Sequence, residues 1–157
     1  ALPLSGAELK GLAGLGEEYD DDAVDQLIRG GVTPLESANG AVSVVRAVTT
    51  RATTGGAADA TWRELSTILV VDEVIPAIRN ALRAKFQRVK NTEQTRGAIR
   101  SQVVLELEDR VSREIIDSYE DVTVEPENGD PTVCRVEFAF AVTHGLDQIW
   151  LSAHITV

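Results

Sequence analysis

The chain has 157 residues and a formal net charge of −10 at pH 7, with 43% hydrophobic and 25% charged residues. These proportions are typical of a globular protein rather than a disordered one, and the length fits a single domain over residues 1–157. The acidic balance argues against direct binding of nucleic acid, because phosphate contacts need a basic surface. No apolar run approaches the ~20 residues of a membrane span and no signal-peptide pattern opens the chain, so we expect no membrane insertion.

The N-terminal third predicts a short helix followed by a hairpin. Residues 1–20 are expected to form an irregular leader, because glycines interrupt any helix there. The run Asp20-Asp21-Asp22 favours a helix N-terminus, and Gly30-Gly31 ends that helix. Asn39-Gly40 then predicts a hairpin between strands at 32–37 and 41–49, since Asn-Gly is the strongest short-range hairpin signal.

The middle of the chain predicts a mobile loop, a strand and two long helices. Residues 51–60 are small and polar, which is typical of a loop. Residues 64–71 fit either a strand or a helix start, and their β-branched side chains favour the strand. Pro76 is tolerated only in a first helical turn, so we expect one helix from Asp72 to Val89. Its apolar stripe is Ile75, Ile78, Leu82, Phe86 and Val89.

A second long helix is predicted from Glu93 to Arg113, with Thr92 as its cap. Its apolar stripe is Ile99, Val103, Leu107 and Val111, broadened by Val104. From residue 115 onward the period becomes two, which predicts strands at 118–125, 133–143 and 148–157. The fold class is therefore α+β, with a mostly antiparallel sheet covered on one face by two long antiparallel helices.

The terminal strand keeps its apolar alternation to the last residue, whereas chain ends usually carry small polar residues. Two interpretations stay open. The strand can pair within its own molecule, or it can act as an arm that joins a neighbouring molecule, because an unpaired edge is a template for association. The residues that would form this subunit-linking strand are Ile149, Trp150, Leu151, Ala153, Ile155 and Val157.

The sequence carries no motif for nucleotide binding, metal ligation or nucleophilic catalysis, so we expect no catalytic, metal or cofactor-binding site and no enzyme. His144 and Asp147 are adjacent in a predicted turn, but no nucleophile accompanies them. Cys134 lies on the apolar face of a predicted strand, where a cysteine behaves as a small hydrophobe. As the lone cysteine it excludes an internal disulfide.

Basic residues concentrate between Arg79 and Arg100, where the only acid is Glu93. One interpretation is a solvated helix face. The other is a docking surface for an acidic partner, because solvated helices usually interleave both signs of charge. The basic residues of this stretch are Arg79, Arg83, Lys85, Arg88, Lys90, Arg96 and Arg100.

Three segments in order resemble the C-terminal region of tail sheath proteins from contractile phage tails and related injection machines. They are the hairpin from Gly30-Gly31 to Val45-Arg46-Ala47-Val48-Thr49-Thr50, the segment 65–86, and the ending from Gly145 to Val157. The absence of methionine also predicts that the chain is a fragment or a processed form. The resemblance covers nearly the whole chain and rests on the order of the segments.

The resemblance implies a structural protein of a bacteriophage or prophage virion tail, assembled in the host bacterial cytoplasm and serving genome ejection. The chain would be an inner-layer domain that polymerises into a contractile sheath, with strand exchange between subunits. Its partners would be neighbouring sheath subunits, the tail tube protein, and baseplate or terminator proteins. The resemblance implies tube contact through charged helices, and the candidate tube-facing residues are Arg79, Arg83, Lys85, Arg88 and Lys90.

Two other functions stay open from the sequence. The chain can be a tail terminator or adaptor that forms a single ring. It can also be a small α+β ligand-binding domain or enzyme whose pocket the sequence does not reveal.

Overall fold

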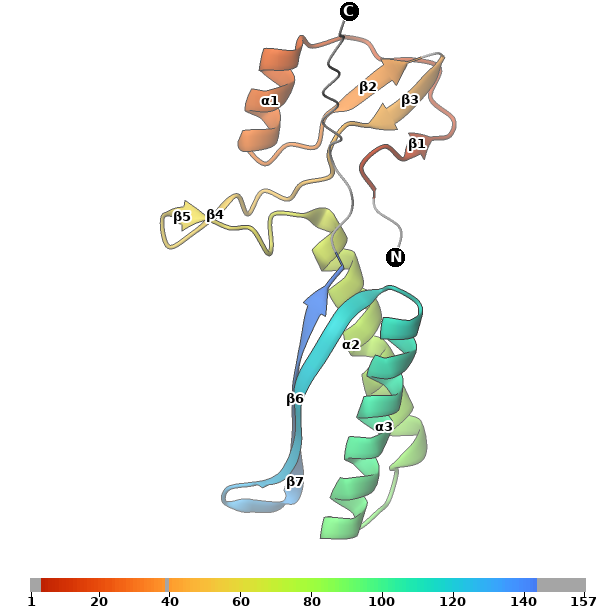
Figure 1. Cartoon of the computed structure of the whole chain (residues 1–157), viewed down its shortest axis with the longest axis vertical. Coiled ribbons are helices and arrows are strands. Elements are labelled where there is room, and N and C mark those ends of the chain that lie inside the picture. Colours follow the sequence, from red (N-terminus) through yellow and green to blue (C-terminus); the bar gives the residue numbers. More distant parts are fainter. Residues whose placement is uncertain (1–3, 39, 144–157) are drawn as a thin grey trace, which may run out of the picture. The chain divides into compact units, whose positions relative to one another are not determined.

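The computed structural model describes residues 4–38 and 40–143, which form two compact units (Figure 1). The N-terminal unit comprises the described residues up to Ile68, and the C-terminal unit comprises Leu69–Thr143. The predicted strand 148–157 lies outside the described residues.

The N-terminal unit contains the predicted helix, and a hairpin whose two strands are shorter than the predicted 32–37 and 41–49. Helix α1 (Asp21–Arg29) begins after Asp20, whose Oδ1 accepts a hydrogen bond from the Ala23 amide at 2.8 Å. Strands β2 (Leu35–Ala38) and β3 (Ala41–Val44) pair antiparallel, and β1 (Glu8–Leu9) adds to the other edge of β3. The capping carboxylate thus begins the helix that it predicts, and the strands on either side of the Asn-Gly motif pair as predicted.

The prediction of a mobile loop at 51–60 is wrong, because this segment forms a small hairpin. Strands β4 (Thr53–Thr54) and β5 (Ala57–Ala58) pair antiparallel. Gly55 and Gly56 connect them with φ of 60° and 84°, the left-handed conformation that a tight hairpin turn requires.

The prediction of a strand at 64–71 is also wrong. Helix α2 runs from Leu65 to Lys85 and contains Pro76 in its interior, so it begins earlier and ends earlier than predicted. Val70, Val74 and Ile78 are each at most 3% exposed, and this spacing of four residues buries one continuous helical face. Packing therefore outweighs both β-propensity and the cost of an interior proline.

The second half of the C-terminal unit follows the predicted order. Helix α3 (Glu93–Ser112) begins after Thr92, whose hydroxyl accepts a hydrogen bond from the Thr95 amide. Strands β6 (Ile116–Glu127) and β7 (Asp130–Val142) form a long antiparallel hairpin, with ends beyond the predicted ones. Along β7, half-buried residues alternate with exposed ones, as the period of two predicts.

The core of the C-terminal unit combines residues from both long helices and from β6 and the loop before it. Val74, Val103 and Leu107 are fully buried, whereas Val89 of the predicted stripe is 50% exposed because α2 ends before it. The fold is α+β with antiparallel sheets, and the described strands form three separate sheets. That two long helices cover one face of a single sheet stays a prediction. The buried cluster consists of Val70, Val74, Ile78, Val103, Leu107, Ile115, Ile116 and Val122.

Candidate functional site

The structure places the candidate tube-facing residues in two groups. Arg79 and Arg83 are exposed on α2, one helical turn apart. Arg88 and Lys90 are exposed in the connection between α2 and α3. None of these four side chains has a hydrogen-bond or ion-pair partner among residues 4–38 and 40–143. Cations without carboxylate partners are available to an acidic partner.

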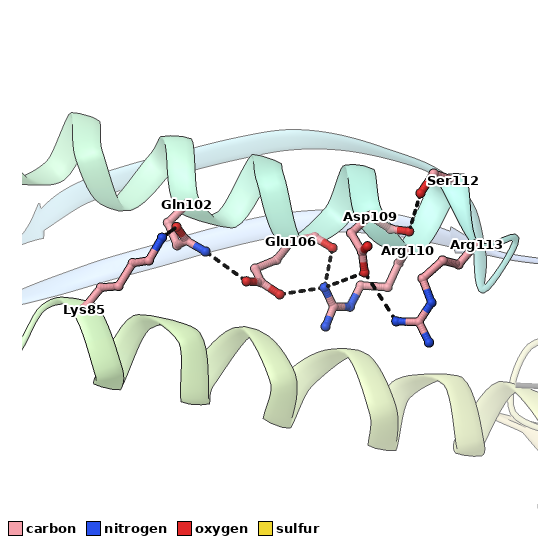
Figure 2. A network of polar contacts seen from close by, with 7 residues as sticks. All are labelled: Lys85, Gln102, Glu106, Asp109, Arg110, Ser112 and Arg113. Carbon is pink, nitrogen blue, oxygen red and sulfur yellow. Dashed lines mark hydrogen bonds and ion pairs between the residues drawn. The ribbon is translucent and has the colours of Figure 1, made fainter.

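Lys85 differs from the other four candidates because its ammonium is engaged within the chain. Its Nζ donates a hydrogen bond to Oε1 of Gln102 on α3. Figure 2 shows Lys85 reaching from α2 to the side chains of α3. Lys85 therefore joins the two helices, and because Gln102 is neutral the ammonium keeps its positive charge.

A chain of polar side chains continues from Lys85 along α3 (Figure 2). Gln102 donates to Oε1 of Glu106 at 2.9 Å, and Oε2 of Glu106 pairs with Nη1 of Arg110 at 2.6 Å. The Arg110 side chain is only 9% exposed, and its Nε has no partner within the described ranges. Sequence reasoning missed this chain, although the spacing of four between residues 102, 106 and 110 is the signal for it.

The connection between α2 and α3 is attached to β7. The Asn91 side-chain amide donates to the carbonyl oxygens of Pro131 and Val133 at 2.9 and 3.2 Å, and its Oδ1 accepts from Arg96 at 3.0 Å. Arg88 adopts φ of 60°, which is uncommon for a residue with a side chain. These bonds fix the backbone that carries Arg88 and Lys90.

The β6–β7 hairpin is a two-stranded sheet among the described residues, so neither outer edge has a described partner strand. Asp121 has φ of 56° beside a register irregularity in β6, and Nε of Arg100 donates to the carbonyl oxygen of Val122 at 2.8 Å. Tyr119 donates to Glu108 of α3. Burial and this hydrogen bond raise the pKa of the Tyr119 hydroxyl. Both contacts attach β6 to α3.

In the N-terminal unit, the hairpin motif of the resemblance fixes the start of α2. The Thr33 hydroxyl donates to the carbonyl oxygen of Val48 and accepts from its amide, at 2.9 and 3.0 Å. Val48 also forms a bridge with Glu64, whose carboxylate accepts from Arg46 at 2.7 Å. The threonine of the motif therefore bonds to the Val48 backbone, and the arginine bonds to the Glu64 side chain just before α2.

Asp59 organises the β4–β5 hairpin. Its carboxylate accepts from the Thr54 hydroxyl at 2.6 Å and from the amides of Thr61 and Trp62. Arg51 lies 3.3 Å from the carboxylate and 5.7 Å from the centroid of the Trp62 ring system. The Thr54 hydrogen bond contributes most to lowering the pKa of Asp59.

The described residues include a cavity and a cysteine thiol. They contain no group of three His, Cys, Asp or Glu side chains that could hold a metal ion. A cavity of about 220 Å³ in the N-terminal unit, lined in part by Tyr19, Val24 and Leu35, is smaller than the pockets that usually bind drug-sized ligands. Burial raises the pKa of the Cys134 thiol, which disfavours the reactive thiolate. His144 and the subunit-linking strand lie outside the described residues.

In the ranges that the structure covers, no helix combines the length and hydropathy needed to cross a bilayer.

Comparison with known proteins gives consistent results. The model of the family described as "Phage tail sheath C-terminal domain" matches residues 57–156 of the chain. The tail sheath protein of Bacillus phage SP01 is 30% identical over 135 residues, a match that covers 85% of this chain and 23% of that protein. The chain therefore spans about a quarter of the length of this curated relative.

Two solved structures share the fold. One is a sheath tail protein from Listeria innocua, with a TM-score of 0.72, 15% identity, and coverage of 92% of this chain and 38% of that chain. The other is a sheath tail protein from Desulfitobacterium hafniense, with a TM-score of 0.69, 12% identity, and coverage of 90% of this chain and 37% of that chain.

Proposed function

The chain belongs to the family of phage tail sheath C-terminal domains, and on that premise we propose that it is part of a protein that polymerises into a contractile sheath around a tail tube. The observation that carries this proposal is the family match over residues 57–156, together with the tail sheath relative at 30% identity. The role is structural, in the virion tail of a phage, and we propose no catalytic step. Assembly would take place in the cytoplasm of the bacterial host.

Subunits are linked by strand exchange in this proposal. The terminal strand with Ile149, Trp150, Leu151, Ala153, Ile155 and Val157 pairs with a sheet edge of a neighbouring subunit. The long β6–β7 hairpin, which has no third strand among the described residues, supports the proposal because unpaired edges accept further strands. Main-chain pairing supplies affinity, and alternating side chains set the register.

A contact of this kind is head-to-tail, so repeating it builds an open helical filament instead of a closed dimer. Contraction is then a change between two packings of linked subunits, without nucleotide hydrolysis. Baseplate and terminator proteins would contact the two ends of the sheath.

The tube contact runs through the basic surface of the C-terminal unit. Arg79, Arg83, Arg88 and Lys90 are exposed cations, and Lys85 adds a fifth positive charge while its ammonium bonds to the neutral Gln102 amide. If this surface contacts the tube, replacing Arg79 and Arg83 with glutamate weakens tube binding, and the wild-type interaction weakens as salt screens the charges.

Electron microscopy of the full-length protein tests the proposal. The wild-type protein is expected to form long tubes or stacked rings, and deletion of residues 150–157 is expected to block linkage while the rest stays folded. A strictly monomeric wild-type protein, with or without tube, contradicts the sheath role. A single ring identifies a terminator instead, and normal polymerisation of the deletion variant contradicts strand exchange.

A further inference from the structure

The connection between α2 and α3 exposes an apolar side chain between two cations. Val89 is 50% exposed, and its neighbours Arg88 and Lys90 are both exposed. Burying half-exposed apolar area is favourable for association, and cations beside it select an acidic partner. The exposed surface of α2 from Arg79 to Arg83 has cations but no exposed large apolar residue among those described.

Hydrogen bonds within the C-terminal unit attach this connection to β7. Arg88 is held in the left-handed region, and the Asn91 side chain attaches the connection to β7 at Pro131 and Val133. Val133 is itself 43% exposed, so the bond brings a second exposed valine to the same end of the unit. A strained residue kept in place by surrounding bonds is typical of a functional site, and a fixed surface loses little entropy on binding.

The charged residues in the connection between α2 and α3 are all basic. No acid lies between Glu73 and Glu93, and Arg88 and Lys90 have no partner among the described residues. On the β7 side, the Asp130 carboxylate accepts hydrogen bonds from the amide and hydroxyl of Thr132. A partner surface with an apolar centre and an acidic rim would complement this arrangement.

We propose that Arg88, Val89, Lys90 and Val133 form a docking patch for an acidic protein surface, with Val89 at the centre of the contact. The inference rests on the proposed function, in which that surface belongs to the tail tube. Val89 enters an apolar depression, and Arg88 and Lys90 contact carboxylates around it. The patch, rather than the α2 surface with Arg79 and Arg83, then carries most of the binding energy.

The test measures binding of the full-length protein to tubes assembled from the tail tube protein of the same phage. V89S should weaken binding about tenfold, the loss typical of a residue at an interface centre. L105S is the matched control, because Leu105 is 57% exposed on α3, away from the patch, and should leave binding unchanged. R88E/K90E should weaken binding more than R79E/R83E.

R88G separates binding from folding. Glycine adopts φ of 60° without strain, so this variant should raise the unfolding temperature while it weakens tube binding. A residue with only a structural role would not shift the two quantities in opposite directions.

Equal tube binding by V89S, L105S and the wild type overturns the patch and leaves the sheath role intact. Altered self-assembly of V89S in the absence of tube also overturns it, because the contact is then between copies of this chain. A wild-type protein that neither polymerises nor binds the tube overturns the proposed function itself.

Discussion

A β-carbon at Gly31 would lie 2.7 Å from the carbonyl oxygen of Thr49 and 2.9 Å from the Cα of Thr50. Gly31 also has φ of 80°, so two independent constraints require glycine at this position. The close approach brings the end of α1 against the segment that follows β3.

We therefore expect G31A to destabilise the N-terminal unit by about 3 kcal/mol or more, through backbone strain plus a clash with rigid main chain. G40A is the control, because Gly40 has φ of 82° but no described atom would lie within 4 Å of a β-carbon there. This variant should lose only about 1 kcal/mol of unfolding free energy. Denaturant unfolding followed by Trp62 fluorescence, in a W150F background, measures both. Equal losses in the two variants would contradict the close contact.

The Thr33 hydroxyl forms hydrogen bonds with both the amide and the carbonyl oxygen of Val48. T33V should therefore lower the free energy of unfolding by about 2 kcal/mol. Valine keeps the shape of threonine but leaves both groups of Val48 without their partner. T33S keeps the hydroxyl and should lose less than T33V in the same unfolding measurement. If T33S lost as much stability as T33V or more, the hydroxyl would not be the main contribution of Thr33.

The β4–β5 hairpin should loosen in acid. Hydrogen bonds and Arg51 lower the pKa of Asp59 below its ordinary value of 3.8, so the charged carboxylate stabilises the hairpin above that pH. The stabilisation is lost as the pH falls through the lowered pKa of the folded state. Trp62 emission in the W150F background should therefore change below about pH 3.8. D59N should lack this transition, and an identical acid transition in D59N would assign it to another group.

The parts of the fold that the sequence predicts are those whose cause is local. Asp20 caps α1 through a contact three residues away, and β2 pairs with the strand that follows it directly in the sequence. The start of α2 was missed because β-branched residues at 67–71 favour a strand, while the burial of Val70 with Val74 and Ile78 is decided by packing against α3 and β6. Propensity cannot reveal that packing.

The same distinction applies to the candidate site. The excess of cations between Arg79 and Arg100 is visible in the sequence, and so is the spacing of residues 102, 106 and 110. The bonds from Asn91 to Pro131 and Val133 join residues about 40 positions apart, so no local pattern indicates them. The exposure of Val89 follows from where α2 ends, which only the structure gives.

Pro76 lies inside α2, where it removes the hydrogen bond to the carbonyl of Asp72. The residue is exposed, so P76A should restore this bond without disturbing the core and stabilise the C-terminal unit by about 1 to 3 kcal/mol. Circular dichroism with denaturant measures the change, and A84S on the exposed face of the same helix controls for surface substitution. A destabilised P76A would show that the helix needs the proline geometry.

The ion pair between the half-buried Glu106 and the buried Arg110 should show strong coupling. E106L removes the carboxylate and leaves the Arg110 side chain, which is 9% exposed, without its main anionic partner. The free energy of unfolding should fall by about 3 kcal/mol. Replacing both residues, in E106L/R110M, removes the unpaired charge and should recover much of that loss. The four proteins of this double-mutant cycle are compared by denaturant unfolding. Additive losses in the two single variants would mean that solvent, and not the partner, stabilises each charge. R113M is the control, because the Arg113 side chain is 57% exposed. It should change the free energy of unfolding by less than about 0.5 kcal/mol, both in the wild type and in E106L/R110M.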